Sequence, residues 1–220
     1  RIYANTKNGP ADYSPENVPY HPEYVAPISL DGYKEGSFCM TLGYPGSTER
    51  YLSSYGIEEM MNVINQAKKY IYITTPYLII DNEMMTALCL ASKKGIDVRI
   101  ITPGIPDKKL VFLLTRSYYR QLLEAGVRIY EYTPGFIHAK SFVCDDEIAV
   151  VGTINLDYRS LYLHFECAAW MYQCQAVGQV KEDMLNTFRN SREVSLNTCK
   201  EQNVFRRGLQ SILRLFAPML

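Results

Sequence analysis

The sequence has no net charge and no long apolar run, and these two absences exclude several classes of protein. Basic and acidic side chains number 23 each among the 220 residues, so no general positive field points to a nucleic-acid partner. No apolar stretch approaches the roughly 18 residues of a transmembrane helix, and no signal peptide is visible. The first residue is Arg1 rather than methionine, so we expect the chain to be a fragment of something longer.

Cysteine is present, but without the C-x-x-C pairs or the small, cysteine-dense framework of a disulfide-bonded protein. The chain has six cysteines and is long enough to bury a proper core, as one large domain or two small ones. The sequence therefore indicates a reducing compartment.

Residues 1–55 are rich in proline, glycine, tyrosine, asparagine and serine. This composition predicts an irregular lead-in with one short strand near Phe38 to Leu42, because it cannot build a core of its own. We interpret the segment as a linker packed on a neighbouring domain, with His21 as a solvated loop residue.

Residues 56–200 alternate between helical and strand-like patterns. Apolar side chains recur at helical spacing from Ile57 to Ala67. Asp81 is placed to cap the next helix, and Gly95 and Gly126 are placed to end two helices. The expected strands are 70–75, 97–102 and 127–132, and the later expected helices are 107–125 and 178–192. This alternation predicts an α/β layered domain with a mixed, largely parallel sheet flanked by helices.

Residues 133–160 carry the strongest signal in the chain. They read TPGFIHAKSFVCDDEIAVVGTINLDYRS and match the pattern H-x-K-x4-D-x6-G-[ST]-x-N. Alternating apolar and β-branched residues predict a strand from Phe136 to Val143, with His138 and Lys140 side by side on one face. An imidazole beside an ammonium suits a phosphate, because it pairs a nucleophile for phosphorus with a cation for the charged oxygens.

The rest of this stretch predicts a hairpin that brings further donors to the same phosphate. Asp145 and Asp146 form the expected turn, residues 147–151 form the second strand, and a loop follows. That loop offers backbone N–H groups, the Thr153 hydroxyl and the Asn155 amide. Asp145 is offset from the His–Lys pair by an odd number of residues, so we expect it to stabilise the turn rather than contact substrate.

Glu166 is the one carboxylate in an apolar run, Leu161 to Tyr172, that predicts a strand. It either marks the edge of the strand or acts as a buried acid that orients a histidine and stabilises its cationic form. We favour the second interpretation, because a lone acid in a core strand needs a partner. His164 shares a face with Glu166 by alternation, so it competes for this carboxylate in a supporting or a catalytic role.

Residues 201–220 predict a basic amphipathic helix. One face carries Phe205, Leu209, Ile212, Leu213 and Phe216, while Arg206, Arg207 and Arg214 fall outside it. Such a helix can lie in a lipid headgroup layer or pack its apolar face on the domain, and the pattern leaves both interpretations open.

The motif pattern resembles the signature of the phospholipase D superfamily. The resemblance covers nearly the whole chain and narrows to bacterial cardiolipin synthases of the phospholipase D type. It is carried by NQAKKYIYITTPYLIIDNEMMTAL, KGIDVRIITPGIPDKK, LLEAGVRIYEYTPGFIHAKSFVCDDEIAVVGTINLDYRSLYLHFECAAW and the closing LRLFAPML. Members of that family carry two membrane helices and then two copies of the motif, and this chain resembles their second half.

This resemblance implies a phosphatidyl transfer that needs no metal or other cofactor. One motif histidine attacks the phosphorus of phosphatidylglycerol and releases glycerol, and the other acts as general acid and then as general base for a second phosphatidylglycerol. The implied product is cardiolipin. The implied partners are a membrane surface and either the first-motif half of the same polypeptide or a second copy of the chain, with no nucleic acid. The implied location is the bacterial cytoplasmic membrane, with the active domain facing the cytoplasm.

The resemblance also divides the candidate site residues into two groups. The catalytic group comprises His138, Lys140, Asp145 and Glu166. The substrate-binding group comprises Asn155, Thr153, Tyr77 and Arg159. His138 would take the place of one motif histidine, for which we expect the acid–base role, and the half that supplies the nucleophile stays open. Lys140 and Asn155 would hold phosphate oxygens, and Glu166 would orient His138.

Two other functions stay open at this stage. The first is a hydrolytic phosphodiesterase, either a phospholipase or a nuclease, that works as a homodimer of single-motif chains. The even charge balance counts against the nuclease. The second is a non-catalytic lipid-binding fragment, against which the intact motif residues argue.

Overall fold

The computed structural model describes residues 3–9, 12, 14–22, 55–164, 166–200 and 204–217. The chain divides into two compact units, Arg1–Gly43 and Tyr44–Leu220. In the first unit two short strands pair antiparallel, β1 (Tyr3–Ala4) and β2 (Val18–Pro19). His21 is exposed as expected, and the strand predicted near Phe38 lies outside the described residues.

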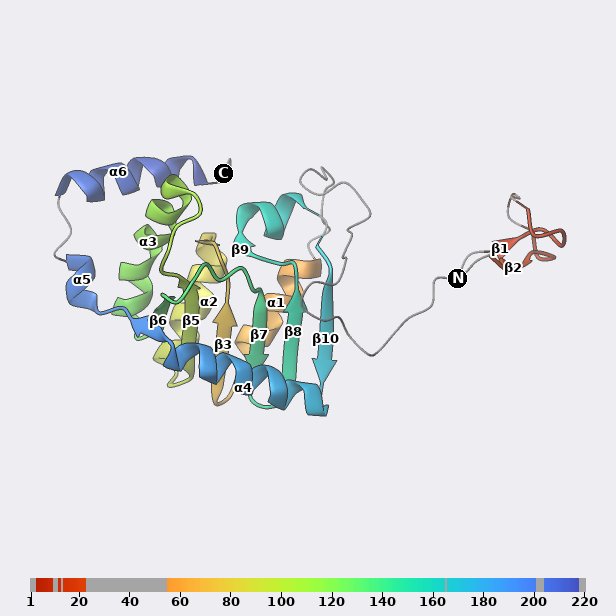
Figure 1. Ribbon diagram of the computed structural model, residues 1–220, viewed down its shortest axis with the longest axis horizontal. Coiled ribbons are helices and arrows are strands. Elements are labelled where there is room, and N and C mark those ends of the chain that lie inside the picture. The colour runs from red at the N-terminus through yellow and green to blue at the C-terminus, as the bar shows by residue number, and fades with distance from the viewer. Residues whose placement is uncertain are drawn as a thin grey trace. The chain divides into compact units, whose positions relative to one another are not determined.

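The main sheet of the second unit has seven described strands in the order β10-β8-β7-β3-β5-β6-β11 (Figure 1). β3, β5 and β6 run parallel to one another, and the other pairings are antiparallel. The bounds are β3 (Tyr70–Thr74), β5 (Asp97–Pro103), β6 (Arg128–Tyr132), β7 (Ser141–Cys144), β8 (Ile148–Gly152), β10 (Ala168–Tyr172) and β11 (Ser191–Glu193). The predicted α/β class with a mixed sheet is confirmed.

Helices cover both faces of this sheet (Figure 1). One face packs against α4 (Gln175–Arg189), and the other packs against α1 (Tyr55–Gln66), α2 (Asn82–Lys93) and α3 (Lys109–Glu124). The alternation in β3 explains both layers, because Tyr70 and Tyr72 join the α4 side while Ile71 and Ile73 join the other side. All of β3 is buried, as expected for a central strand between two helical layers.

The predicted helix ends are confirmed at three positions. The Asp81 carboxylate accepts a hydrogen bond from the Met84 N–H at 2.7 Å and caps α2. Gly95 and Gly126 follow α2 and α3 with φ angles of 90° and 96°, a left-handed conformation that favours glycine. These glycines let the chain turn sharply into β5 and β6.

The strand predicted around His138 begins later than expected. β7 begins at Ser141, so His138 and Lys140 lie in the connection before the strand, and the prediction was wrong over its first half. The register gives the reason. Ser141 pairs with Thr74, the last residue of β3, and Pro76 beyond it has no N–H to offer.

The run from Leu161 to Tyr172 is a strand only in its last part. A π-helical turn, η1 (Arg159–Leu163), comes first, and β10 begins at Ala168. Ala168 pairs with Gly152, the last residue of β8, so β8 offers no partner to the residues before it. The predicted strand was therefore wrong over Leu161–His164 and at Glu166 and Cys167.

Several short elements complete the second unit. The helix predicted over 178–192 ends at Arg189, and β11, which was not predicted, follows it and pairs with β6. A separate parallel pair joins β4 (Leu78–Ile79) and β9 (Leu156–Asp157). The last described elements are α5 (Leu196–Lys200) and α6 (Val204–Leu215). Within the described residues, no helix is long and apolar enough to cross a membrane.

Candidate functional site

Except for Asp145, the motif residues gather at one edge of the main sheet, the upper edge in Figure 1. β3, β5, β6 and β8 end at this edge, while β7 and β10 begin there, as their registers require. The crevice beyond the carboxyl ends of parallel strands is the usual place for a ligand in an open α/β sheet. The connections at this edge carry Tyr77, Asp107, His138, Lys140, Asn155 and Glu166.

The His138 imidazole has aromatic rings as neighbours and is exposed to solvent. The centroid of its ring lies 5.5 Å from that of Phe136 and 6.1 Å from that of Tyr77. Partial burial and the Lys140 ammonium lower the pKa of His138, while the Asp107 carboxylate acts in the opposite direction. His138 is therefore biased toward its neutral form, in which a ring nitrogen can accept a proton or attack phosphorus.

Lys140 supplies the cation of the site. Its Nζ donates a hydrogen bond to the carbonyl oxygen of His138 at 2.7 Å. Burial lowers the pKa of Lys140, and the carboxylates of Glu166 and Asp157 oppose that shift. These two acids favour the charged ammonium in a half-buried position, where it can stabilise the negative charge of a phosphate.

Thr153 joins the loop after β8 to the start of β10. Its N–H donates to the Cys167 carbonyl at 2.9 Å, and the Cys167 N–H donates back to the Thr153 hydroxyl at 2.9 Å. A Cβ on Gly152 would lie 2.3 Å from the Cys167 carbonyl oxygen, so this motif position requires glycine. The Gly152 N–H also donates to the Lys140 carbonyl at 3.1 Å, which connects the two parts of the motif.

Asn155 lies in the same loop, and the oxygen of its side-chain amide is buried. Its Oδ1 has no hydrogen-bond partner among the described residues. The backbone beside it is fixed, because the Leu156 N–H donates to the Thr75 hydroxyl at 3.0 Å, and that hydroxyl donates to the Tyr77 carbonyl at 2.8 Å. Buried polar groups are normally paired, so this oxygen, which can only accept, calls for a donor from a ligand or a water molecule.

Glu166 contacts Thr153 and approaches His164. The Thr153 hydroxyl donates a hydrogen bond to Glu166 Oε2. His164 Nδ1 lies 4.0 Å from Glu166 Oε1, and the Glu166 side chain is 11% exposed. Within the described part of the chain, no hydrogen bond joins Glu166 to His138, so its orienting role stays a prediction. The contacts that Glu166 makes here fix the loop after β8.

Tyr77 and Asp107 form a hydrogen-bonded pair beside His138. The Tyr77 hydroxyl donates to Asp107 Oδ2 at 2.6 Å, and burial together with this bond raises the pKa of Tyr77. The sequence singled out Tyr77 as a residue that lines the pocket, but it placed Asp107 only at the start of a helix. The signal that would have found Asp107 is its position just after β5, at the carboxyl end of a parallel strand.

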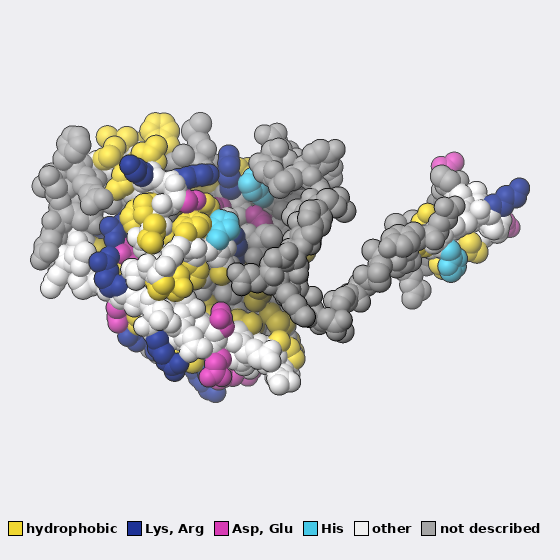
Figure 2. Space-filling model, in the orientation of Figure 1, with side chains coloured by type: hydrophobic (Ala, Val, Ile, Leu, Met, Phe, Trp, Pro, Cys, Tyr) yellow, Lys and Arg dark blue, Asp and Glu magenta, His cyan; other side chains and the backbone are white. Residues whose placement is uncertain are grey.

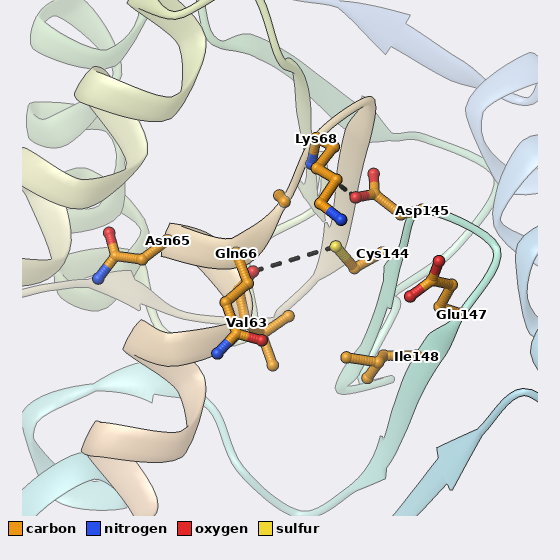
Figure 3. Close-up of a pocket in the computed structure, with 9 residues that line it drawn as sticks. Val63, Asn65, Gln66, Lys68, Cys144, Asp145, Glu147 and Ile148 are labelled. Atoms are coloured by element: carbon orange, nitrogen blue, oxygen red, sulfur yellow. Dashed lines mark hydrogen bonds between the residues drawn. The ribbon is translucent and has the colours of Figure 1, made fainter.

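Asp145 lies at the opposite edge of the sheet, where it binds backbone. Its carboxylate accepts hydrogen bonds from the N–H groups of Lys68, Lys69 and Tyr70 at 2.6, 2.9 and 2.9 Å. These bonds tie the β7–β8 turn to the start of β3, in keeping with the turn-stabilising role predicted for Asp145. A cavity of about 560 Å³ opens beside it, lined by residues from 63–68 and 144–148 (Figure 3).

Two observations complete the description of the candidate residues. Arg159 begins η1, and its side chain is exposed. Across the described ranges, no group of three or more histidine, cysteine, aspartate or glutamate side chains is placed to hold a metal ion.

Two family models match parts of the chain. The model described as "Cardiolipin synthase, PLD-like domain" matches residues 60–188, which include the motif and the edge of the sheet around it. The model described as "Peptidase S46" matches residues 1–87, which are less than half of the chain and end before the motif.

Similar curated proteins are much longer than this chain. A cardiolipin synthase of Halalkalibacterium halodurans is 37% identical over 199 residues, which are 90% of this chain and 39% of that protein. An uncharacterized protein of Streptococcus mutans is 52% identical over 160 residues, which are 73% of this chain and 35% of that protein. The chain thus spans less than half the length of these relatives.

Solved structures share the fold. Phosphatidylserine synthase of Haemophilus influenzae superposes with a TM-score of 0.57 at 21% identity, over 73% of this chain and 42% of that one. Nuc of Salmonella typhimurium, a phospholipase D family member, superposes with a TM-score of 0.55 at 18% identity, over 63% of this chain and 90% of that one. Because the family model matches more than half of its residues, the chain belongs to the family of cardiolipin synthase PLD-like domains.

Proposed function

We propose that this chain is one half of a phosphatidyltransferase site that makes cardiolipin from two molecules of phosphatidylglycerol and releases glycerol. The observation that carries the proposal is the convergence of His138, Lys140 and Asn155 at one edge of the sheet. Together they offer a basic nitrogen, a cation and an amide donor to a single phosphodiester. Relatives named cardiolipin synthase support this choice of lipid.

We assign His138 the acid–base role and give the nucleophilic role to the motif histidine of the other half. The nucleophilic nitrogen attacks phosphorus, the bond from phosphorus to the glycerol oxygen breaks, and His138 donates a proton to that oxygen. His138 then takes the proton from the hydroxyl of a second phosphatidylglycerol, whose oxygen displaces the histidine nitrogen from phosphorus. The lowered pKa of His138 favours the neutral base that this second step needs.

The other polar residues act on the phosphate or on its surroundings. Lys140 and Asn155 would hold the non-bridging oxygens, which carry the negative charge throughout both steps. Thr153 and Glu166 would act indirectly, because Thr153 fixes the loop that carries Asn155 and Glu166 favours the charged form of Lys140. Tyr77 would border the site through its contact with His138.

In this proposal the nucleophilic histidine is not part of the residues 1–220 that supply His138. A curated cardiolipin synthase that the chain matches is more than twice as long as the matched part, which leaves room for a first-motif half in the same polypeptide. A second copy of the chain is the other possible source. We place the protein at the cytoplasmic membrane with the active unit facing the cytoplasm, as the similarity to bacterial cardiolipin synthases suggests.

A product assay tests this function. The chain is incubated with phosphatidylglycerol in mixed micelles, alone and with the first-motif half, and cardiolipin and released glycerol are both quantified. The test variant is His138→Ala. The matched control is His21→Ala, the same change at an exposed histidine outside the motif.

We expect cardiolipin and glycerol in equal amounts from the wild type and from His21→Ala, and a loss of about 10²-fold or more in His138→Ala. Unchanged turnover in His138→Ala would contradict the catalytic assignment. Phosphatidic acid in place of cardiolipin would identify water as the acceptor and replace the transferase with a phosphodiesterase.

A further inference from the structure

α6 lies against α3 and uses only part of its own surface to do so. Gln210 is buried, and its Nε2 donates a hydrogen bond to the Leu113 carbonyl of α3 at 3.3 Å. The Arg214 guanidinium lies 4.3 Å from the centre of the Tyr118 ring, and Ala217 is buried. The helix is therefore anchored to the domain through a side that mixes polar and apolar residues.

The apolar face predicted for this helix is mostly exposed. Leu213 packs against the core, whereas Leu209, Ile212 and Phe216 are 36%, 56% and 51% exposed. These three residues are spaced by three and four positions, so they form one stripe along the helix. Leu215 is also exposed. The side chains of Phe205, Arg206 and Arg207 lie outside the described residues.

The connection from β5 to α3 extends this exposed apolar surface. Ile105 and Leu110 are 46% and 56% exposed. Lys108 and Lys109, between them in sequence, are exposed and form no ion pair within the described residues. Leu110 lies one turn before Leu113, whose carbonyl accepts the hydrogen bond from Gln210, so α6 and the start of α3 carry exposed apolar side chains at the same end of α3. We refer to the combined surface as the apolar rim, which consists of Ile105, Leu110, Leu209, Ile212, Leu215 and Phe216.

The apolar rim borders the candidate site. The connection that carries Ile105 and Leu110 also carries Asp107, which accepts the hydrogen bond from Tyr77 beside His138. Figure 2 shows hydrophobic side chains over α6 at the upper end of the domain, the end at which the motif residues lie in Figure 1. A surface that covers the rim would therefore also lie close to the edge of the sheet.

We propose that the apolar rim docks onto an anionic phospholipid bilayer and brings the edge of the sheet that carries His138 to the headgroup layer. The proposal rests on the proposed function, in which the anionic lipid phosphatidylglycerol is the substrate. Exposed leucine, isoleucine and phenylalanine side chains suit the boundary between headgroups and acyl chains, and Lys108 and Lys109 suit anionic headgroups. Lysine is depleted in protein–protein interfaces, so these two lysines favour a lipid surface over a protein partner.

Sedimentation with phosphatidylglycerol vesicles tests the docking, with phosphatidylcholine vesicles as the neutral reference. The test variant combines Ile212→Glu with Phe216→Glu. The matched control is Leu90→Glu, because Leu90 is 49% exposed near the end of α2 at the opposite edge of the sheet. We expect the wild type and Leu90→Glu to bind alike, and the double variant to need at least about tenfold more lipid for half-maximal binding.

A second variant tests the charge complementarity. Lys108→Gln combined with Lys109→Gln is expected to weaken binding to phosphatidylglycerol vesicles by about fivefold for each lysine. The same variant is expected to bind phosphatidylcholine vesicles as the wild type does. Circular dichroism and thermal unfolding establish that each variant is folded before its binding is compared.

The outcomes separate docking from chemistry. Wild-type vesicle binding by Ile212→Glu with Phe216→Glu, or an equal loss in Leu90→Glu, would overturn the proposal. The proposal would also be overturned if Ile212→Glu with Phe216→Glu lost binding to the first-motif half but kept its vesicle binding, because a protein would then cover the apolar rim. Vesicle binding without product formation in the presence of the first-motif half would contradict the proposed function and leave the docking in place. Turnover of a soluble short-chain phosphatidylglycerol by Ile212→Glu with Phe216→Glu is expected to match turnover by the wild type.

Discussion

At the scale of single residues, the groups around His138 come from three separate connections. Lys140 is two positions along the chain, but Tyr77 follows β3 and Asp107 follows β5. Partial burial and Lys140 lower the pKa of His138, and Asp107 opposes them. Burial, Lys140 and Asp107 together therefore set how much of the imidazole is neutral at a given pH.

Asp107→Asn is expected to shift the pH dependence of turnover. The Asp107 carboxylate raises the pKa of His138, so its removal lowers that pKa and keeps the ring neutral at lower pH. The acidic limb of the kcat/KM profile should then move to lower pH. The profile is measured from about pH 4 to 9 beside Asp183→Asn, the same change at an exposed carboxylate on α4. A profile that does not move would show that Asp107 has no electrostatic influence on the reacting histidine.

Lys140→Arg is expected to be harmful although it keeps the positive charge. The ammonium is half-buried and donates to the His138 carbonyl at 2.7 Å, where a longer, planar guanidinium cannot replace it. We expect kcat to fall by about 10²-fold or more, in the range for the loss of one charge-stabilising donor. Lys94→Arg, at the exposed end of α2, is the control. Wild-type kcat in Lys140→Arg would remove Lys140 from contact with the phosphate.

The site residues that could be predicted from the sequence lie close together in the chain, whereas the one that was missed lies far from them. His138, Lys140 and Asn155 belong to one short motif whose spacing carries the chemistry. Asp107 is absent from that motif. It lies near His138 because β5 and β7 are both neighbours of β3 in the sheet. The hydrogen bond from Thr153 to the Glu166 carboxylate could not be predicted from the motif, because it depends on the register of β8 and β10.

At the scale of elements, strand prediction succeeded where the neighbouring strand is long enough to pair. β3, β5 and β6 begin or end within one residue of their expected positions. β7 and β10 begin late, because their partners end at Thr74 and Gly152. Apolar alternation continues in the sequence before Ser141 and Ala168, but a strand also needs a neighbour to accept its hydrogen bonds. That requirement is not visible in local sequence.

Gly152→Ala is expected to destabilise the junction of β8 and β10. The added Cβ would lie 2.3 Å from the Cys167 carbonyl oxygen and 2.5 Å from the Ala168 Cα, both of them backbone atoms. We expect the free energy of unfolding to fall by about 1–3 kcal/mol in urea titrations. Gly178→Ala on α4 is the control, since a Cβ there meets nothing within 4 Å and should raise stability by about 0.5–1 kcal/mol. Equal stability of Gly152→Ala and the wild type would contradict the steric explanation.

At the scale of the whole molecule, the candidate site offers one motif histidine of the two that the proposed mechanism needs. The chain matches less than half the length of its curated relatives, and the motif residues lie at an edge of the sheet that is open to solvent at His138. An acid–base histidine without a nucleophile cannot form a covalent intermediate. The proposal therefore requires a second motif histidine to approach this edge from another half of the protein or from another copy.

The assignment of His138 as the acid–base residue predicts which half becomes labelled during turnover. Phosphatidylglycerol labelled with ³²P is mixed with the chain and the first-motif half, and the reaction is quenched in alkali, because phosphohistidine is labile in acid. We expect the label on the first-motif half and not on this chain. His138→Ala should slow both formation and breakdown of the labelled species by about 10²-fold or more, because the leaving glycerol loses its proton donor and the acceptor loses its base. Label on the wild-type chain that disappears in His138→Ala would exchange the two roles. In that case the lowered pKa of His138 would serve nucleophilic attack, which also requires the neutral ring.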